Sequence, residues 1–525
     1  MTDQCVGIDL GTTYSCLAYI DEDGNPAVEK NYEQGETTPS VILFNENGEV
    51  VVGNSAKDQA LMYSKDRVIS AIKRSMGQDY SVTIDGNTYN PTQLSAMILR
   101  KLIGDFEENH GCTLDRAVIT VPAYFGENQK DQTKTAGIIA GLKEVFLINE
   151  PTAAAIAFGY GEPKDKKERV LVYDLGGGTF DVTILEIDSG EFSTVATDGA
   201  MYLGGKDWDA DLTDIILEKV AEESGTDKNV LKDDPDIMQT LAYDSETIKK
   251  RLSTAENTKG TLTVDGHKYV FNINRDEFES RSEANLLQTI DIIHRVLESK
   301  SFTMDDIDEI ILVGGSSRMP QVKNAIAANF PGKDIKIYDP DQSVAKGAAL
   351  YAHSLMLADL EARGEAPAIG EGDEPPRRVT IKNVLSKTFG IKAIYEDGSE
   401  KISNLIFRNE TLPITKTKIY YPVEDDQSSI KVEIFESAAL NNEEGHKTDT
   451  DDGNLIGDFT MDLPPGTSKD TPIEVTFLAT EEGILTANVK CEDESREYKL
   501  HNDLTMTEEE ISKSQSLMEK VIRSE

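Results

Sequence analysis

The sequence has 525 residues, of which 53 are lysine or arginine and 95 are aspartate or glutamate, giving a net charge of −42. This charge argues against nucleic acid or an anionic membrane as a partner, because both are bound by basic surfaces. The length predicts two or more domains, since one hydrophobic core rarely serves so long a chain.

The cysteines and the first residues indicate the compartment. Cys5, Cys16, Cys112 and Cys491 are scattered without a CxxC motif, which favours reduced thiols over a disulfide framework or a zinc site. The chain runs directly into a predicted strand, without a signal peptide. No apolar stretch approaches the roughly 20 residues of a membrane helix. We therefore expect a soluble, cytoplasmic protein.

Two segments are near copies of each other: VGIDLGTTY at residues 6–14 and VYDLGGGTFD at residues 172–181. In each, a β-type run ends at an aspartate, Asp9 or Asp174, a Gly/Thr turn follows, and a second β-type run comes after the turn. Glycines let backbone N–H groups approach an anion, and threonine hydroxyls add donors. The aspartates could hold a hydrated Mg²⁺. Either segment alone also fits a simple hairpin, but the pair predicts a duplicated fold that grips a nucleotide phosphate chain from both sides.

The pattern changes along the chain. Residues 1–362 alternate strand-like and helix-like segments and predict an α/β nucleotide-binding domain, closed by a helix over residues 343–363. Residues 363–383 contain a Pro-, Gly- and acid-rich stretch and predict a linker. Residues 384–503 alternate with period two and predict an antiparallel β-sandwich. Thr507 and Glu510 form a capping box for a short helix within residues 504–525.

Three motifs carry a resemblance to a known family: IDLGTTYS at residues 8–15, DLGGGTFDV at 174–182 and ILVGGSSRMP at 311–320. The segments VPAYF (121–125) and NEPTAAA (149–155) accompany them in the expected order. The chain resembles the seventy-kilodalton heat-shock chaperones, closely to about residue 379 and more loosely beyond it. The resemblance implies an α/β actin-like (duplicated ribonuclease-H-like) ATPase domain, then a β-sandwich peptide-binding domain and a short C-terminal helix, read here as a truncated lid.

The resemblance also implies ATP or ADP as ligand, with Mg²⁺ and with K⁺ as a further ion. It places four carboxylates around the hydrated Mg²⁺ and the attacking water, namely Asp9, Asp174, Asp181 and Glu150, and Lys73 at the γ-phosphate. Catalysis would fall to Lys73, Glu150, Asp174, Asp9 and Thr179. The phosphates would lie on Thr12, Thr13, Gly177, Gly178 and Thr179. The further nucleotide-binding residues implied at this end are Gly11, Tyr14, Gly176, Gly204 and Gly205. Phosphoryl transfer needs mainly charge neutralisation and a positioned water, and no Walker-type motif is present.

Adenosine contacts are implied in the same way. Glu246, Lys249, Lys250 and Ser253 would face the ribose and the base from one helix, and Lys250 stands where many family members carry a stacking arginine. Gly314, Gly315, Ser316, Arg318 and Asp341 would complete this end. Without the resemblance, residues 246–253 fit an ordinary amphipathic helix, and Lys73 fits a surface charge.

The β-rich region would bind an extended peptide, with an apolar pocket selecting one side chain. The resemblance puts six residues around that pocket: Ile391, Ile394, Tyr420, Val423, Ile430 and Val432. Alternation alone would place the same residues in a sandwich core. Implied partners are unfolded polypeptide segments, a J-domain co-chaperone and a nucleotide exchange factor.

Several positions depart from the family pattern. The apolar family linker is here Val379–Asn383, interrupted by Thr380 and Lys382, and burying an unpaired lysine would cost several kcal/mol. This predicts weak linker docking and weak coupling between the domains. Phe146 and Lys130 stand where bacterial members carry arginines for J-domain docking and interdomain signalling, and residues 200–202 read Ala-Met-Tyr instead of Asp-Thr-His.

The sequence therefore predicts an ATP-dependent chaperone that binds extended apolar segments of unfolded proteins and hydrolyses ATP slowly. An alternative is an ATP-binding conformational switch of the same fold without productive refolding. A sugar or metabolite kinase on the shared fold is a third reading, which the C-terminal β-rich region disfavours.

Overall fold

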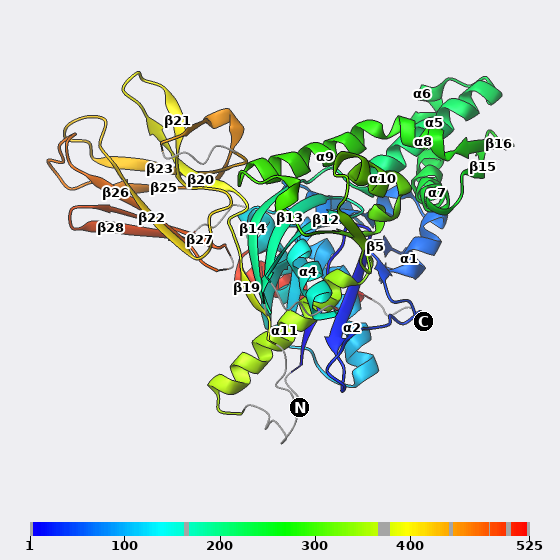
Figure 1. Ribbon diagram of the computed structural model, residues 1–525, viewed down its shortest axis with the longest axis horizontal. Helices are drawn as coiled ribbons and strands as arrows, with labels where there is room; N and C mark the ends of the chain where they lie inside the picture. The colour runs from blue at the N-terminus through cyan, green and yellow to red at the C-terminus, as the bar shows by residue number, and fades with distance from the viewer. Residues whose placement is uncertain are drawn as a thin grey trace.

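The computed structural model describes residues 4–161, 167–188, 190–365, 378–439, 445–481, 483–499 and 506–521. Two six-stranded mixed sheets form its body (Figure 1). The first has the order β11 (Glu144–Asn149), β10 (Arg116–Val121), β1 (Cys5–Asp9), β2 (Tyr14–Ile20) and β3 (Pro26–Val28), with β4 (Thr38–Pro39) beside β2. The second has the order β18 (Asp334–Ile337), β17 (Glu309–Val313), β12 (Glu168–Leu175), β13 (Phe180–Asp188), β14 (Glu191–Ala200) and β19 (Thr380–Lys382).

The two sheets repeat one arrangement. β1–β2–β3 and β12–β13–β14 are antiparallel meanders, and each first strand pairs on its other edge with a parallel strand, β10 or β17. A further parallel strand, β11 or β18, follows. The two near-copy segments therefore form equivalent hairpins, β1–β2 and β12–β13, as their sequences predicted.

Two helices pack between the sheets: α4 (Glu150–Gly161) and α11 (Ser343–Ala362). Their alanine-rich faces contribute Ala153, Ala154, Ala348 and Ala352 to one buried cluster with both sheets. A Cβ on Gly347 would lie 1.7 Å from the Ala153 carbonyl oxygen, so the helices touch backbone to backbone there. Such close packing sets the spacing of the two hairpins that face each other beyond it.

Other elements cover the outer faces of the sheets. On the first sheet, α2 (Pro91–His110) and α3 (Glu127–Ile139) build the core, together with the sheet β6 (Val50–Val52), β5 (Val41–Phe44), β7 (Val68–Ser70), and the hairpin β8 (Val82–Ile84), β9 (Asn87–Tyr89). The short helix α1 (Asn54–Gln59) forms a separate small cluster with β5 and β6 through Ala56. The second sheet carries α5 (Gly205–Ser224), α6 (Lys228–Asp233), α7 (Pro235–Thr254), the hairpin β15 (Asn257–Val264), β16 (His267–Asn274), α8 (Arg275–Arg281), α9 (Glu283–Glu298) and α10 (Pro320–Asn329).

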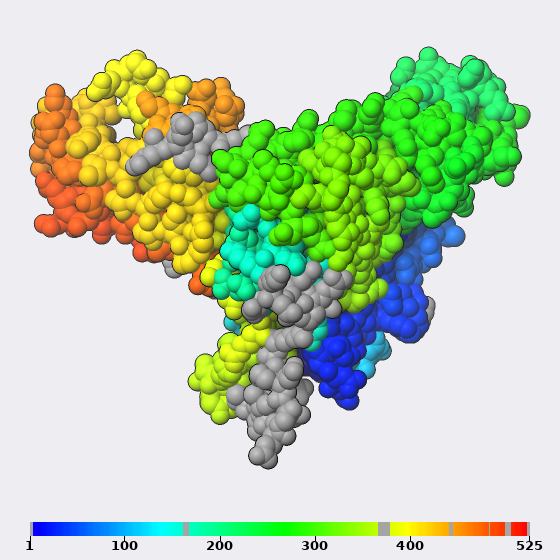
Figure 2. All heavy atoms as spheres, in the orientation of Figure 1, coloured from blue at the N-terminus to red at the C-terminus, as the bar shows by residue number. Residues whose placement is uncertain are grey.

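The β-rich region has two antiparallel sheets that share one core. One has the order β24 (Lys447–Asp449), β21 (Glu400–Ile406), β20 (Thr388–Ile394), β23 (Ser429–Ser437), β25 (Gly453–Asp462). The other has the order β22 (Ile414–Tyr420), β26 (Ile473–Ala479), β27 (Leu485–Cys491), β28 (Glu494–Lys499). The period-two pattern predicted these strands. Figure 2 shows this region, in yellow to orange-red, set to one side of the α/β body.

The segment at the end of the predicted linker does dock, and the expectation that Lys382 prevents docking is wrong. Residues 380–382 form β19, which pairs in parallel with β14 at the edge of the second sheet. Lys382 stays on the surface, where its ammonium lies 2.6 Å from Glu191, while Val379 and Ile381 pack on the apolar cluster around α4. Residues 366–377 of the predicted linker lie outside the described residues, as do 500–505 and 522–525.

The predicted C-terminal helix is present as α12 (Glu508–Leu517), with the capping box of Thr507 and Glu510. It packs against α3, and Ser514 accepts a hydrogen bond of 2.9 Å from Gln93 of α2. Met518, just beyond α12, is buried in the core of the first sheet. The end of the described chain is thus anchored on the α/β body rather than on the β-rich region.

Candidate functional site

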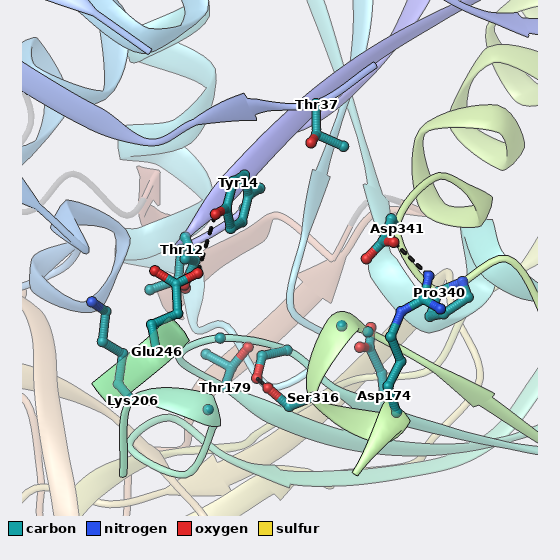
Figure 3. A pocket seen from close by; sticks show the side chains of 18 of the residues that line it. Thr12, Tyr14, Thr37, Asp174, Thr179, Lys206, Glu246, Ser316, Pro340 and Asp341 are labelled. Atoms are coloured by element: carbon teal, nitrogen blue, oxygen red, sulfur yellow. Dashed lines mark hydrogen bonds and ion pairs between the residues drawn. The ribbon is translucent and has the colours of Figure 1, made fainter. Parts of the chain in front are cut away.

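A cavity of about 710 Å³ lies between the two hairpins. The turns after β1 and β12 line it with Asp9, Gly11, Thr12, Thr13 and Tyr14, and with Asp174, Gly176, Gly177 and Thr179. Figure 3 shows Thr12 and Glu246 on one side of the cavity, and Pro340 and Asp341 on the other. Residues predicted from motifs more than 300 positions apart therefore surround one space.

Glycine is required where the two turns meet. A Cβ on Gly177 would lie 2.0 Å from the Thr13 hydroxyl, and one on Gly178 would lie 2.5 Å from the Thr12 side chain. Gly204 packs against the Gly178 backbone, because a Cβ on Gly204 would lie 2.7 Å from backbone atoms of Gly178. Side chains at these positions would push the turns apart, so the cavity keeps its width because the glycines are there.

The carboxylates of Asp9, Asp174 and Glu150 line the cavity, and Asp181 lies opposite Asp174 on β13. Burial and the Glu150 carboxylate raise the pKa of Asp9 to about 7 and that of Asp181 to about 8. The same two causes, together with the neighbouring aspartates, raise the pKa of Asp174 well above its ordinary value. Buried carboxylates that repel one another are stabilised when a cation binds among them.

The donor chemistry fits a hydrated Mg²⁺. In the part of the chain that the structure describes, no three His, Cys, Asp or Glu side chains are placed to ligate one ion directly. Asp9 accepts a hydrogen bond of 3.1 Å from Thr120, and Asp181 accepts one of 3.1 Å from the Tyr124 backbone. Carboxylate oxygens are ligands that Mg²⁺ accepts, and this ion commonly keeps several of its waters.

Lys73 is buried beside these carboxylates and pairs with Glu150. It lies in the short 3₁₀ turn η3 (Ile72–Ser75), which starts after Ala71 in the left-handed region at φ 56°. Ala71 turns the chain so that Lys73 enters the cavity instead of continuing along β7. The ammonium also lies 5.8 Å from the centre of the Phe125 ring.

The far end of the cavity carries the residues implied for adenosine. Arg318 and Asp341 form an ion pair of 2.5 Å, and the Ser316 hydroxyl donates to the Gly176 carbonyl at 2.9 Å. Lys249 donates to the Gly205 carbonyl at 2.6 Å. The remaining predicted residues that line this end are Lys250, Ser253, Gly314 and Gly315.

Glu246 lies at the centre of a charged cluster. Its carboxylate is 2.7 Å from the ammonium groups of both Lys57 and Lys250, and it accepts a hydrogen bond of 3.1 Å from Tyr14. Burial alone would raise the pKa of Glu246, but the two ammonium groups lower it to about 2. Lys250 is thus engaged with Glu246 and lies 4.7 Å from the Tyr14 ring centre.

Three predicted residues do not line the cavity: Asp181, Gly178 and Gly204 are absent from its wall. Asp181 lies in β13 opposite Asp174, and the two glycines support the turns by close approach. Conversely, Lys206 and Asp209 line the cavity, and Asp209 lies 2.7 Å from Lys249. Sequence reasoning missed both, although they lie one and four residues after Gly205, which was predicted.

The six residues predicted for a peptide pocket lie in different environments. Ile391 and Val432 are buried in the shared core of the β-rich region, and Tyr420 and Ile430 pack partly buried against it. Ile394 and Val423 are exposed, at 54% and 66%. The structure therefore brings the first four together and places the last two on the surface.

No helix in the described ranges is long and apolar enough to cross a membrane. Cys5, Cys16, Cys112 and Cys491 are all free thiols, as their spacing predicted.

Comparison with known proteins gives a consistent result. The family model described as "Hsp70 protein" matches residues 5–85 and 80–525. The protein named Chaperone protein DnaK from Thermosipho melanesiensis is 39% identical over 492 residues, covering 92% of this chain and 78% of its own. Chaperone protein DnaK from Thermosipho africanus is also 39% identical over 492 residues, covering 92% of this chain and 77% of its own.

Proposed function

The chain belongs to the Hsp70 family, and we propose that its two facing acid-bearing turns are the ATP-hydrolysing site of an ATP-dependent chaperone whose β-rich region holds the client. Membership of the family makes the chain an ATP-dependent chaperone and an ATP hydrolase. The finer assignment is an actin-like ATPase domain followed by a β-sandwich peptide-binding domain. The repeated strand order of the two large sheets supports it.

One observation carries the assignment of the site. Two equivalent turns, each with an aspartate and threonines, meet over one cavity that also receives the buried pair of Lys73 and Glu150. Backbone N–H groups and hydroxyls of the turns would bind the phosphates. Mg²⁺, when bound through water to Asp9, Asp174 and Asp181, would supply charge neutralisation on the phosphates.

Each protein group then has a role that its position allows. Lys73 would hold the γ-phosphate and orient the attacking water, while Glu150 would fix Lys73 and accept a hydrogen bond from that water. Thr179, Thr12 and Thr13 would donate to phosphate oxygens. Arg318, opposite Glu246, would stack on adenine, and Glu246 and Lys249 would bind the ribose.

The client site is proposed at the edge of the β-rich core. Ile430 and Tyr420 are partly buried against that core, and Ile394 and Val423 are exposed. An extended peptide could place one apolar side chain on the first pair and run its backbone past the second. Unfolded segments, a J-domain co-chaperone and a nucleotide exchange factor are the proposed partners. The four free thiols agree with a cytosolic location.

The experiment is ATP turnover of the full chain with Mg²⁺, with and without an unfolded apolar heptapeptide, alongside binding of the same labelled peptide. We expect slow turnover that the peptide raises. ATP binding without hydrolysis would favour a conformational switch. Phosphate transfer to a sugar instead of water would favour a kinase.

A further inference from the structure

A second cavity of about 250 Å³ adjoins the nucleotide cavity. Four residues line both cavities: Thr12, Thr13, Lys206 and Glu246. Beyond them the second cavity is walled by Lys57 of α1, by the turn η2 (Lys65–Arg67) through Lys65, by the end of β7, and by α7. Arg318 and Asp341 line only the first cavity. The two cavities therefore meet at the Thr12–Thr13 turn, at Lys206 and at Glu246, away from Arg318 and Asp341.

The second cavity also reaches the segment that carries Lys73. Ser70 and Ala71 line it, and Ala71 immediately precedes η3, from which Lys73 enters the nucleotide cavity. The Thr12–Thr13 turn and the start of η3 thus lie between the second cavity and the part of the nucleotide cavity where hydrolysis would occur.

The second cavity is lined by three lysines and one carboxylate, Glu246. Lys57 is already paired with Glu246 at 2.7 Å. In the described ranges of the chain, no ion pair joins the ammonium group of Lys65 or of Lys206 to a carboxylate. Thr12, Thr13, Ser40, Ser70 and Tyr243 also line this cavity, and the Ser40 hydroxyl already donates to the Gly11 carbonyl at 2.7 Å.

Lys206 is fixed between the two cavities. Its backbone N–H donates to the Gly177 carbonyl at 2.8 Å, which holds it against the second phosphate turn. Figure 3 shows its side chain rising beside Glu246. Burial lowers the pKa of Lys206, with Asp209 and Glu246 opposing the effect at a distance. An ammonium group that is partly buried and has no ion pair is costly, so an anion bound beside it would be stabilised.

We propose that the second cavity binds inorganic phosphate, received from the nucleotide cavity past Lys206 after ATP has been hydrolysed. The ligand would be a small tetrahedral dianion, whose oxygens accept from the ammonium and hydroxyl donors of the wall. At about 30 Å³ per water molecule, a cavity of about 250 Å³ has room for this ion with several waters. The inference rests on the ATP hydrolysis proposed for the first cavity.

The test is binding of radiolabelled inorganic phosphate to the full chain, pre-loaded with ADP and Mg²⁺, by equilibrium dialysis. We expect one saturable site. Lys206→Gln should weaken it by about tenfold, as for the loss of a charged donor. Lys65→Gln, which alters an exposed lysine at the mouth of the second cavity only, should weaken it by about threefold. Lys323→Gln, an exposed lysine on α10, is the matched control and should leave binding unchanged.

Two results would overturn the inference: no saturable phosphate binding, or binding that falls in Lys73→Gln but is unchanged in Lys65→Gln and Lys206→Gln. The second result would place the phosphate in the nucleotide cavity. ADP binding of each variant is measured in parallel, which confirms folding. A wild-type protein that binds no ADP would contradict the proposed function itself and is thereby distinguished from failure of the phosphate site.

Discussion

The guanidinium group of Arg408 lies 2.8 Å from the carboxylate of Asp198, and both side chains are buried. Arg408 follows β21 in the β-rich region, whereas Asp198 belongs to β14 of the α/β body. Arg295 of α9 also contacts Asp198, at 2.9 Å. Burial would raise the pKa of Asp198, but the two guanidinium groups hold it below its ordinary value. This ion pair fastens one region to the other.

Arg408→Ala should release the β-rich region from the α/β body. Removing one partner of a buried pair leaves the other charge uncompensated and costs about 3–5 kcal/mol. Lys382→Ala, which breaks the exposed pair with Glu191, should have little effect on stability. The measurement is amide hydrogen exchange of β14 and β19, which reports the free energy of local opening. Equal exchange in the two variants would show that Arg408 does not hold the contact.

Docking of β19 predicts that nucleotide state controls client release. Ile381 packs on the apolar cluster around α4, so Ile381→Asp would place a carboxylate there and detach β19 from β14. We expect the wild-type protein to release a labelled peptide at different rates with ATP and with ADP, because the two states differ in contacts. Ile381→Asp should make the two rates equal. If the wild-type protein releases the peptide at equal rates with ATP and with ADP, the weak coupling between the domains predicted from the linker sequence would be supported instead.

The expectation that the linker does not dock is wrong for a physical reason. The sequence shows Lys382 interrupting an apolar run, but its partner Glu191 is 191 positions away. Only the parallel pairing of β19 with β14 brings the two charges together at the surface. The Arg408–Asp198 pair is hidden from the sequence for the same reason, because neither residue belongs to a motif.

The candidate site was more predictable than the contacts between regions. Asp9 and Asp174 sit in repeated Gly/Thr turns, so local pattern placed both. Lys206 and Lys57 are single charges on helices, and nothing local distinguishes them from surface lysines. In the β-rich region, alternation predicted the strands but could not separate core from pocket. Val432 on β23 is buried, whereas Val423 lies in the connection between β22 and β23 and is exposed.

The buried carboxylates predict an unusual pH dependence for the nucleotide-free protein. The pKa of Asp181 is about 8 when folded, against 3.8 ordinarily. Between these values the folded state binds a proton that the unfolded chain has lost, so the free energy of unfolding falls as pH rises through this window. Asp181→Asn keeps an acceptor for the Tyr124 N–H and should stabilise the protein at pH 8 by about 2 kcal/mol, with little effect near pH 4.

Urea unfolding of wild-type protein and Asp181→Asn at several pH values measures this difference. Mg²⁺ with ADP should stabilise the wild type more at pH 8 than at pH 5, since the cation compensates the ionised carboxylates. The exposed Asp305→Asn serves as the control. The same pH slope in all three proteins would show that Asp181 is not forced into its acidic form by burial.

Ile430 offers a test of the client site. It is partly buried against the core on β23, and a leucine-like client side chain packed on it would contribute about 1.5–3 kcal/mol. Ile430→Asp should abolish binding of a fluorescent apolar heptapeptide while ATP turnover without peptide stays unchanged. Thr460→Asp, exposed on the neighbouring strand β25, is the control. Peptide binding that survives in Ile430→Asp would move the client site elsewhere.

The central claim is that the facing turns and Lys73 hydrolyse ATP, and single-turnover hydrolysis of bound ATP tests it most directly. Lys73 pairs with Glu150 in the wall of the cavity, where it would position the attacking water. Lys73→Ala should therefore bind ATP with nearly unchanged affinity and cleave it about a hundredfold more slowly than the wild type. Cleavage at the wild-type rate in Lys73→Ala would contradict the account.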